Sequence, residues 1–210
     1  MQRYLLCLFL YNHLYLVYSQ SVNSFHDAGI YTTMEWTKEQ PLIITPQIWV
    51  NLGKTYMELR YHYEDAQTMA FYLGRTVALN EGKRWEKIET FELVPALGLT
   101  VGRTNAISFA LNGEFQHKKV SAFLQSQYTH SVQKEGQRFA WVWLGSNFQF
   151  SKYVGVGAAV QALQPLEDVV AIRLAPMLSV NYAALSVEFY SYNFWQAQRV
   201  WAVGVQYEFD

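Results

Sequence analysis

From Gly29 onward, apolar and polar residues alternate with a period of two, and this pattern constrains the fold more than any other feature of the chain. Side chains on a β-strand point alternately to opposite faces, so the period predicts strands with one apolar and one mixed face. No window shows a sustained helical period. In the last segment the apolar set is Trp201, Val203, Val205, Tyr207 and Phe209. The sequence therefore predicts an all-β fold.

The alternating segments recur at about the ten-residue length that a tilted strand needs to cross a bilayer. Their residues lie at 30–36, 48–52, 57–63, 69–74, 91–100, 107–114, 120–129, 141–150, 154–161, 170–174, 185–189 and 200–209. About twelve strands in consecutive hairpins predict a transmembrane antiparallel up-and-down β-barrel. Tight turns are expected near 53, 117, 152 and 178 on one side, and polar loops near 38–44, 132–138, 164–168 and 194–198 on the other. The polar stretch 80–87 would form a long loop on the tight-turn side, which leaves ten strands as the alternative.

Charged residues are sorted onto one of the two faces. A lipid-facing Arg or Lys at mid-bilayer costs roughly 2–4 kcal/mol, so the charged face should be the lumen. The residues in phase with it are Glu58, Arg60, Glu92, Glu114, Arg173, Glu188 and Glu208. Arg75 is the exception, because it is in phase with Phe71 and Leu73, and it should lie at an interface where its side chain can snorkel. Pro95 cannot donate a ladder hydrogen bond, so a bulge or a local edge is expected there.

The composition agrees with a lipid-facing barrel. The chain of 210 residues is 51% hydrophobic and 17% aromatic, with a mean hydropathy of -0.05. Only 16% of its residues are charged, against about a quarter in soluble domains. Many aromatic residues and no long apolar run after the N-terminal segment are typical of barrels with aromatic girdles. A net charge of -1 gives no electrostatic basis for binding nucleic acid, and no motif predicts a cofactor.

Residues 1–19 resemble a signal peptide in their order, with Arg3 followed by an apolar run. Val17 and Ser19 could occupy the small-residue positions before cleavage, so the β-barrel domain is predicted over 20–210. Cys7 is the only cysteine. Tyr4 occupies the position where a lipoprotein signal has leucine, so export without lipidation is favoured. Removal of this segment would leave no thiol, which excludes cysteine catalysis and cysteine-based metal sites.

The last strand carries a family resemblance. Gly204, Tyr207 and Phe209 resemble the Gly-x-x-apolar-x-aromatic pattern that closes Gram-negative outer-membrane β-barrel proteins. The resemblance implies an outer-membrane location, contact with outer-membrane lipids, and a last strand that is read as a signal by the barrel-assembly machinery. Two positions depart from the pattern, because Ala202 stands where a polar residue is preferred and Asp210 follows the last aromatic residue.

Glu58, Arg60 and His62 form a charged stripe on one predicted strand. They could form a constriction or a binding site for a polar solute, with His62 as a group that titrates near neutral pH. The favoured interpretation is a salt-bridge network that fills a narrow lumen, because buried charges must be paired. The possible partners are Glu92, Glu114, Arg173 and Glu188.

Other candidate sites are weak. His130 and Ser131 are adjacent, so on a strand they would point to opposite faces and could not form a nucleophile–base pair. The histidines show no metal-ligand spacing. Gly155 and Gly157 lack the further glycine and the helix of a nucleotide-binding loop. No catalytic or metal-binding residue is predicted, and Trp141 and Trp143 are expected to point inward and help to fill the lumen.

The favoured function is a membrane structural protein or a narrow, porin-like channel for small polar solutes. A lipid-modifying outer-membrane enzyme is one alternative. A soluble periplasmic barrel that binds a hydrophobic ligand is the other, and it requires the apolar face to point inward.

Overall fold

A computed structural model of the protein describes residues 27–38, 41–61, 67–79, 88–133, 138–165 and 170–209. The strands are β1 (Asp27–Trp36), β2 (Ile43–Leu52), β3 (Thr55–Tyr61), β4 (Thr68–Arg75), β5 (Val77–Ala78), β6 (Thr90–Gly102), β7 (Ala106–His117), β8 (Val120–Ser131), β9 (Arg138–Gln149), β10 (Val154–Pro165), β11 (Ala171–Tyr182), β12 (Leu185–Tyr192) and β13 (Val200–Phe209). Within the described part of the chain, no helix is long and apolar enough to span a bilayer.

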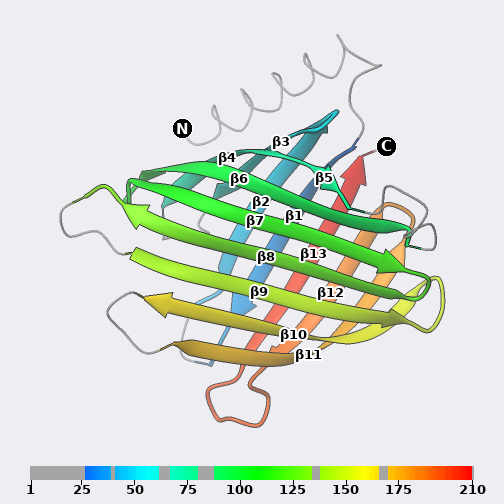
Figure 1. The fold of residues 1–210 in the computed structure, drawn as a ribbon. Coiled ribbons are helices and arrows are strands. Elements are labelled where there is room, and N and C mark those ends of the chain that lie inside the picture. Colours follow the sequence, from blue (N-terminus) through cyan, green and yellow to red (C-terminus); the bar gives the residue numbers. More distant parts are fainter. Residues whose placement is uncertain are drawn as a thin grey trace, which may run out of the picture.

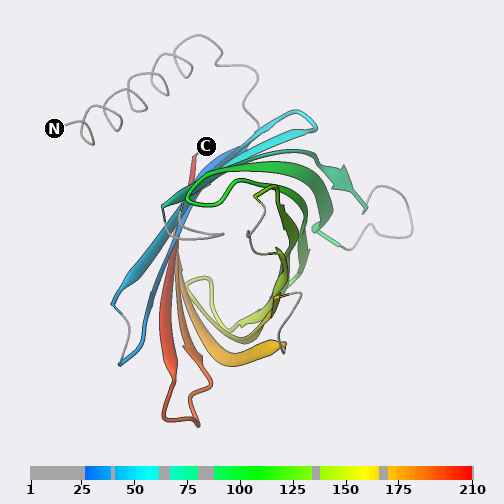
Figure 2. The same ribbon diagram turned by 90° about the vertical axis from the view of Figure 1, so that its left-hand side faces the viewer.

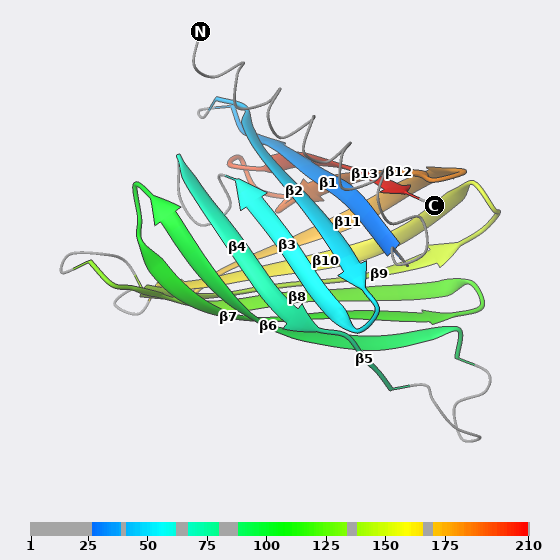
Figure 3. The ribbon, with the colours of Figure 1, turned by 90° about the horizontal axis from the view of Figure 1, so that it is seen from above.

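The strands form one closed antiparallel barrel (Figures 1 and 2). β1 pairs with both β2 and β13, and β4 pairs with β6 to complete the ring. The short β5 also pairs with β6 and extends the path of β4, so the barrel has twelve strand positions. Figure 3 shows β1–β4 crossing the strands of the opposite wall, β8–β11, because the strands of a barrel are tilted relative to its axis. The prediction of twelve strands is confirmed, and the alternative of ten is wrong.

The break between β4 and β5 lies beside Pro95. Gly74 pairs with Ala96 before the break, and Val77 pairs with Leu93 after it. The two pairs share one register, so no extra residue is inserted and there is no bulge. The ladder is interrupted at the residue that lacks a backbone N–H, as expected for a proline within a sheet.

The two ends of the barrel differ. One end, called here the turn end, has tight turns at 53–54, 118–119, 150–153 and 183–184, and both Asp27 and Phe209 lie there. The other, the loop end, carries the connections after β1, β3, β6, β8, β10 and β12. The turn predicted near 178 is wrong, because β11 continues to Tyr182 with Leu178 and Val180 keeping the outward phase. Residues 80–87 lie outside the described part of the chain.

The outer face is apolar. Leu97, Phe109 and Ile172 are 57%, 58% and 59% exposed, and they belong to a continuous belt of outward apolar side chains larger than a soluble monomer exposes. Arg75 also points outward, but it pairs with Thr55 beside the 53–54 turn, at the end of its strand. An outward apolar face contradicts the soluble ligand-binding barrel, which needs that face inside. The belt is the lipid-facing surface of a membrane-spanning barrel.

Replacing Leu97 by arginine should destabilise the folded barrel by roughly 2–4 kcal/mol, because Leu97 is near the middle of β6 and faces lipid. Val101→Arg is on the same face but at the end of the strand, near the bilayer interface. This substitution should lower the free energy of unfolding by only about 0–1 kcal/mol. Urea unfolding in lipid vesicles, followed by tryptophan fluorescence, measures both values. If both variants lost the same free energy of unfolding, the assignment of the apolar belt as the lipid-facing surface would be contradicted.

Candidate functional site

The inward face of the barrel is acidic. Among the described strand residues, the inward charged groups are seven carboxylates and two guanidinium groups, which gives a formal charge of minus five. They are Asp27, Glu35, Glu58, Glu92, Glu114, Glu188 and Glu208, against Arg60 and Arg173. This excess is concentrated inside the barrel, since the whole chain has a net charge of only -1. The lumen therefore has an electrostatic preference for cations.

Near the loop end, Arg60 is the centre of a buried polar network. Its Nε and Nη2 donate to Glu58 Oε1 and Oε2 at 2.8 and 2.9 Å, and its Nη1 donates to Gln127 Oε1 at 2.8 Å. The guanidinium carbon lies 4.3 Å from the centre of the Tyr72 ring. Arg60 and Glu58 are only 1% and 2% exposed. The bidentate geometry and the third hydrogen bond compensate for removing both charges from water.

The network crosses the barrel from β3 to β8. Tyr72 Oη donates to Gln127 Oε1 at 3.1 Å, and Gln127 Nε2 donates to Thr129 Oγ1 at 2.9 Å. Thr129 and Ser108 are joined by a further hydrogen bond of 3.0 Å. The contacts narrow the lumen at this level and fix the distance between its walls.

The charged residues proposed from the sequence fall into three separate groups. Glu58 and Arg60 are paired in the network. Arg173 lies 3.8 Å from Glu35 near the loop end, and because its side chain is 44% exposed the pair contributes little to stability. Glu92, Glu114 and Glu188 line the cavity described below, and their pairing with the Glu58–Arg60 stripe stays a prediction. His62 lies outside the described residues.

A second group of inward side chains is aromatic. Trp143 is at its centre, with the Phe123 ring at 4.8 Å, the Tyr190 ring at 5.7 Å and the Tyr31 ring at 6.0 Å. These residues come from four strands, β1, β8, β9 and β12, so the Tyr31–Trp143 contact spans the lumen. Trp141 is also inward and lies beside Trp143. The two tryptophans help to fill the barrel, as their phase predicts.

Several inward rings lie against glycines on the neighbouring strand. A Cβ atom added at Gly29, Gly98 or Gly145 would overlap the ring of Trp49, Tyr72 or Phe123, respectively. In each case the glycine and the aromatic residue are direct cross-strand partners. Because the glycine has no side chain, the ring can lie along the wall instead of standing across the lumen. Ring packing over glycine also stabilises a sheet position that is otherwise weak.

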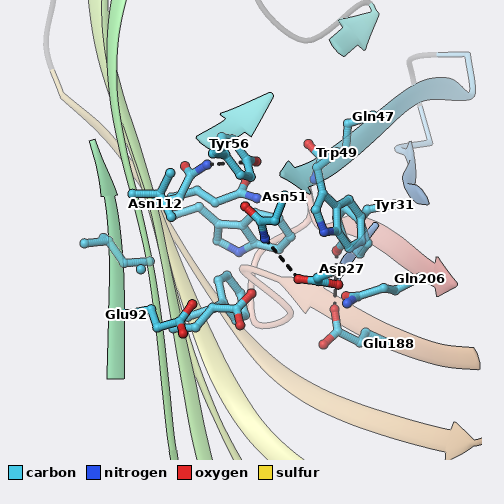
Figure 4. A pocket seen from close by; sticks show the side chains of 17 residues that line it. Asp27, Tyr31, Gln47, Trp49, Asn51, Tyr56, Glu92, Asn112, Glu188 and Gln206 are labelled. Atoms are coloured by element: carbon cyan, nitrogen blue, oxygen red, sulfur yellow. Dashed lines mark hydrogen bonds between the residues drawn. The ribbon is translucent and has the colours of Figure 1, made fainter. Parts of the chain in front are cut away.

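Between these groups and the turn end lies a cavity of about 160 Å³ (Figure 4). Its wall combines carboxylates, amides and aromatic rings. It is lined by Asp27, Tyr31, Gln47, Trp49, Asn51, Tyr56, Glu92, Val94, Asn112, Gly113, Glu114, Phe123, Leu124, Gln125, Trp143, Glu188 and Gln206. No lysine, arginine or histidine is among these lining residues, so the cavity has four carboxylates and no fixed positive charge.

The carboxylates of the cavity have no cationic partner among the described residues. Glu92 and Glu114 are direct cross-strand partners, an arrangement in which like charges repel. Glu188 accepts hydrogen bonds at Oε2 from Tyr190 Oη at 2.6 Å and from Tyr31 Oη at 3.3 Å. Asp27 accepts from Asn51 Nδ2 at 3.1 Å. All of these partners are neutral, so the negative charge of the cavity remains uncompensated.

Ser131 and His130 do not form a nucleophile–base pair. Ser131 is inward and donates to the Asn105 carbonyl at 3.2 Å, whereas His130 points to the outer face. In the described ranges, no group of three His, Cys, Asp or Glu side chains could hold a metal ion.

The sequence missed several residues of the cavity. Asp27 and Gln47 precede the segments that were assigned to the first two strands, although both are in the inward phase of β1 and β2. Extending the period of two by a few residues toward the chain start would have found them. Glu35, which lies outside the cavity and near the loop end, was equally detectable, because it shares the phase of Tyr31.

The closed barrel, its apolar belt and its charged lumen define the class of membrane-spanning β-barrel proteins. Among solved structures, the chain is similar to a KdgM porin in complex with disordered oligogalacturonate, with a TM-score of 0.58 at 14% identity over 87% of this chain and 99% of the porin. A NanC porin gives the same TM-score at 7% identity, over 85% and 98% of the two chains. The fold is therefore that of a porin barrel. No protein-family model and no curated protein matches the chain.

Proposed function

We propose that the protein is a porin-like channel of the outer membrane that admits small polar solutes and prefers cations. The observation that supports the preference is the inward formal charge of minus five among the described strand residues. A charged passage with low-dielectric walls focuses its field and raises the local concentration of counter-ions. The porin fold and the lipid-facing belt support the membrane location.

The charge of the lumen argues against an acidic sugar as the solute. Oligogalacturonate, which the similar KdgM porin was solved with, is a chain of uronic acids with one carboxylate on each sugar. An unbranched polyanion of this kind would be repelled by Glu92, Glu114 and Glu188. Similarity of fold therefore does not transfer that solute to this chain.

The channel is expected to be narrow. Contacts across the lumen occur near the loop end, between Arg60 and Gln127, and deeper in the barrel, between Tyr31 and Trp143. Side chains at both levels take up space that ions would otherwise use. Small hydrated ions and compact solutes fit such a passage better than extended oligomers.

The proposed function is tested by single-channel recording in a planar bilayer, with a salt gradient that separates K⁺ from Cl⁻. The expected result is a small conductance with roughly tenfold preference for K⁺, from the field of the uncompensated carboxylates. Heat-modifiable migration on a gel first checks that the barrel is folded. Absence of current from a folded, inserted barrel, or a preference for Cl⁻, would contradict the proposal.

Two further features belong to the same proposal. Tyr207 and Phe209 are outward and in edge-to-face contact at 5.2 Å, which supports a last strand that the barrel-assembly machinery reads together with Gly204. The signal peptide at 1–19 lies outside the described residues and remains a prediction. Export and assembly would place the apolar belt in contact with outer-membrane lipids.

A further inference from the structure

We propose that the cavity at the turn end binds an organic cation that carries an ammonium group on a compact, ring-sized apolar body. The inference rests on the proposed function, since it names the solute class that the channel would hold. Three independent observations carry it: the charge of the cavity, its aromatic walls, and a buried amide oxygen without a donor.

The first observation is uncompensated charge. Glu188 and Glu114 line the cavity, and neither has a cationic partner among the described residues. Glu114 is the direct cross-strand partner of Glu92, and like charges placed in this way repel each other. A positive group in the cavity would relieve this repulsion, and an ammonium group would also donate hydrogen bonds to the carboxylates.

The second observation is the aromatic wall. Tyr31, Trp49, Tyr56, Phe123 and Trp143 all line the same space. Ring faces attract cations, most strongly when the cation is partly removed from water. The volume of about 160 Å³ is close to the roughly 150 Å³ that holds a benzene molecule in a protein interior. Rings and carboxylates together favour an organic cation over a small hydrated ion.

The third observation is the side-chain amide of Asn112, which lines the cavity (Figure 4). Its Nδ2 donates to Tyr56 Oη at 3.3 Å, whereas its Oδ1 is buried and has no hydrogen-bond partner among the described residues. A buried acceptor without a donor is destabilising, so a ligand that donates a hydrogen bond to this oxygen would be favoured. An ammonium group supplies such donors.

Other occupants fit less well. The described residues provide no group of three metal ligands, and an anion would face four carboxylates. A neutral ring compound without a donor would satisfy the aromatic wall but would leave the charge and the Asn112 amide oxygen unpartnered. The combination of features is met by a cation with an apolar body.

The test uses the full folded barrel in detergent and isothermal titration with 2-phenylethylammonium. Two probes of nearly the same shape serve as controls: neutral 2-phenylethanol and anionic phenylacetate. The expected result is saturable binding of one 2-phenylethylammonium per barrel, at least roughly tenfold tighter than 2-phenylethanol, and no binding of phenylacetate. Equal binding of the charged and neutral probes would overturn the inference.

Variants locate the site. Glu188→Gln keeps the shape and an acceptor for the tyrosine hydroxyls, and it should weaken binding of 2-phenylethylammonium by roughly tenfold. Glu35→Gln is the matched control, because it also removes one inward carboxylate charge but does so outside the cavity. The affinity of this variant for 2-phenylethylammonium should change by less than about twofold. Glu114→Gln is a second test at a more exposed position, in case Glu188→Gln does not fold. Equal affinities for the cavity variants and the Glu35 variant would contradict the assignment.

The two proposals fail in different ways. A barrel that conducts K⁺ but does not bind 2-phenylethylammonium keeps the proposed function and overturns the cavity inference. A barrel that binds the amine selectively but passes no current keeps the cavity inference and overturns the channel.

Discussion

Replacing Arg60 by methionine should destabilise the folded barrel by about 3–5 kcal/mol, because the substitution leaves the Glu58 carboxylate buried without its guanidinium partner. Methionine fills much of the space of the arginine side chain, so the loss reports mainly on charge and hydrogen bonding. Gln127 would also lose the donor that lies 2.8 Å from its Oε1 atom. Urea unfolding of the purified barrel in lipid vesicles gives the free energy of unfolding.

Two variants make this prediction specific. The double variant Glu58→Gln with Arg60→Met should recover most of the lost stability, because no unpaired charge remains in the network. Arg173→Met removes an inward arginine whose ion pair is exposed, and it should cost less than about 1 kcal/mol. If Arg60→Met and Arg173→Met cost the same, the Arg60 network does not stabilise the barrel.

Replacing both Glu92 and Glu114 by lysine should abolish the cation preference of the channel. The double substitution changes the inward charge by four and places two positive groups on adjacent strands at the cavity. The roughly tenfold preference for K⁺ over Cl⁻ expected for the native barrel should disappear or reverse. The shift of the reversal potential in a KCl gradient measures the change.

The control for this substitution alters the same amount of charge outside the lumen. Lys118→Glu with Lys119→Glu lies in a tight turn at the same end of the barrel, where bulk electrolyte screens it. Its selectivity should remain within about twofold of the native value. If the double lysine variant at Glu92 and Glu114 and the turn variant shifted the reversal potential equally, surface charge and not the charge of the lumen would set the selectivity.

The sequence predicted well which side chains point into the lumen and which point outward, because the backbone geometry of a strand alone imposes this alternation. A strand has a period of two, so Glu58 and Arg60 had to share a face once their strand was recognised. The lipid cost of a charged side chain then decided which face was inside. Both steps use only local spacing along the chain, and neither requires knowledge of which strands meet.

Partners across the lumen were not predictable in the same way. Gln127 is 67 residues from Arg60, and the two meet only because of the stagger and tilt with which the barrel closes. The stagger is a property of the whole ring of strands. The sequence named Glu92 and Glu188 only as possible partners of the Glu58–Arg60 stripe, and it could not indicate that the closed barrel brings both of them to the wall of one cavity.

The glycines beneath the inward rings determine how the width of such a channel can change. Tyr72 and Phe123 lie along the wall because Gly98 and Gly145 have no Cβ atom at the point of contact. A single methyl group at either glycine would push a ring toward the axis. The width of the passage therefore depends on the glycines in its wall. Substitutions at these glycines could change that width during evolution without replacing any side chain that a passing solute touches.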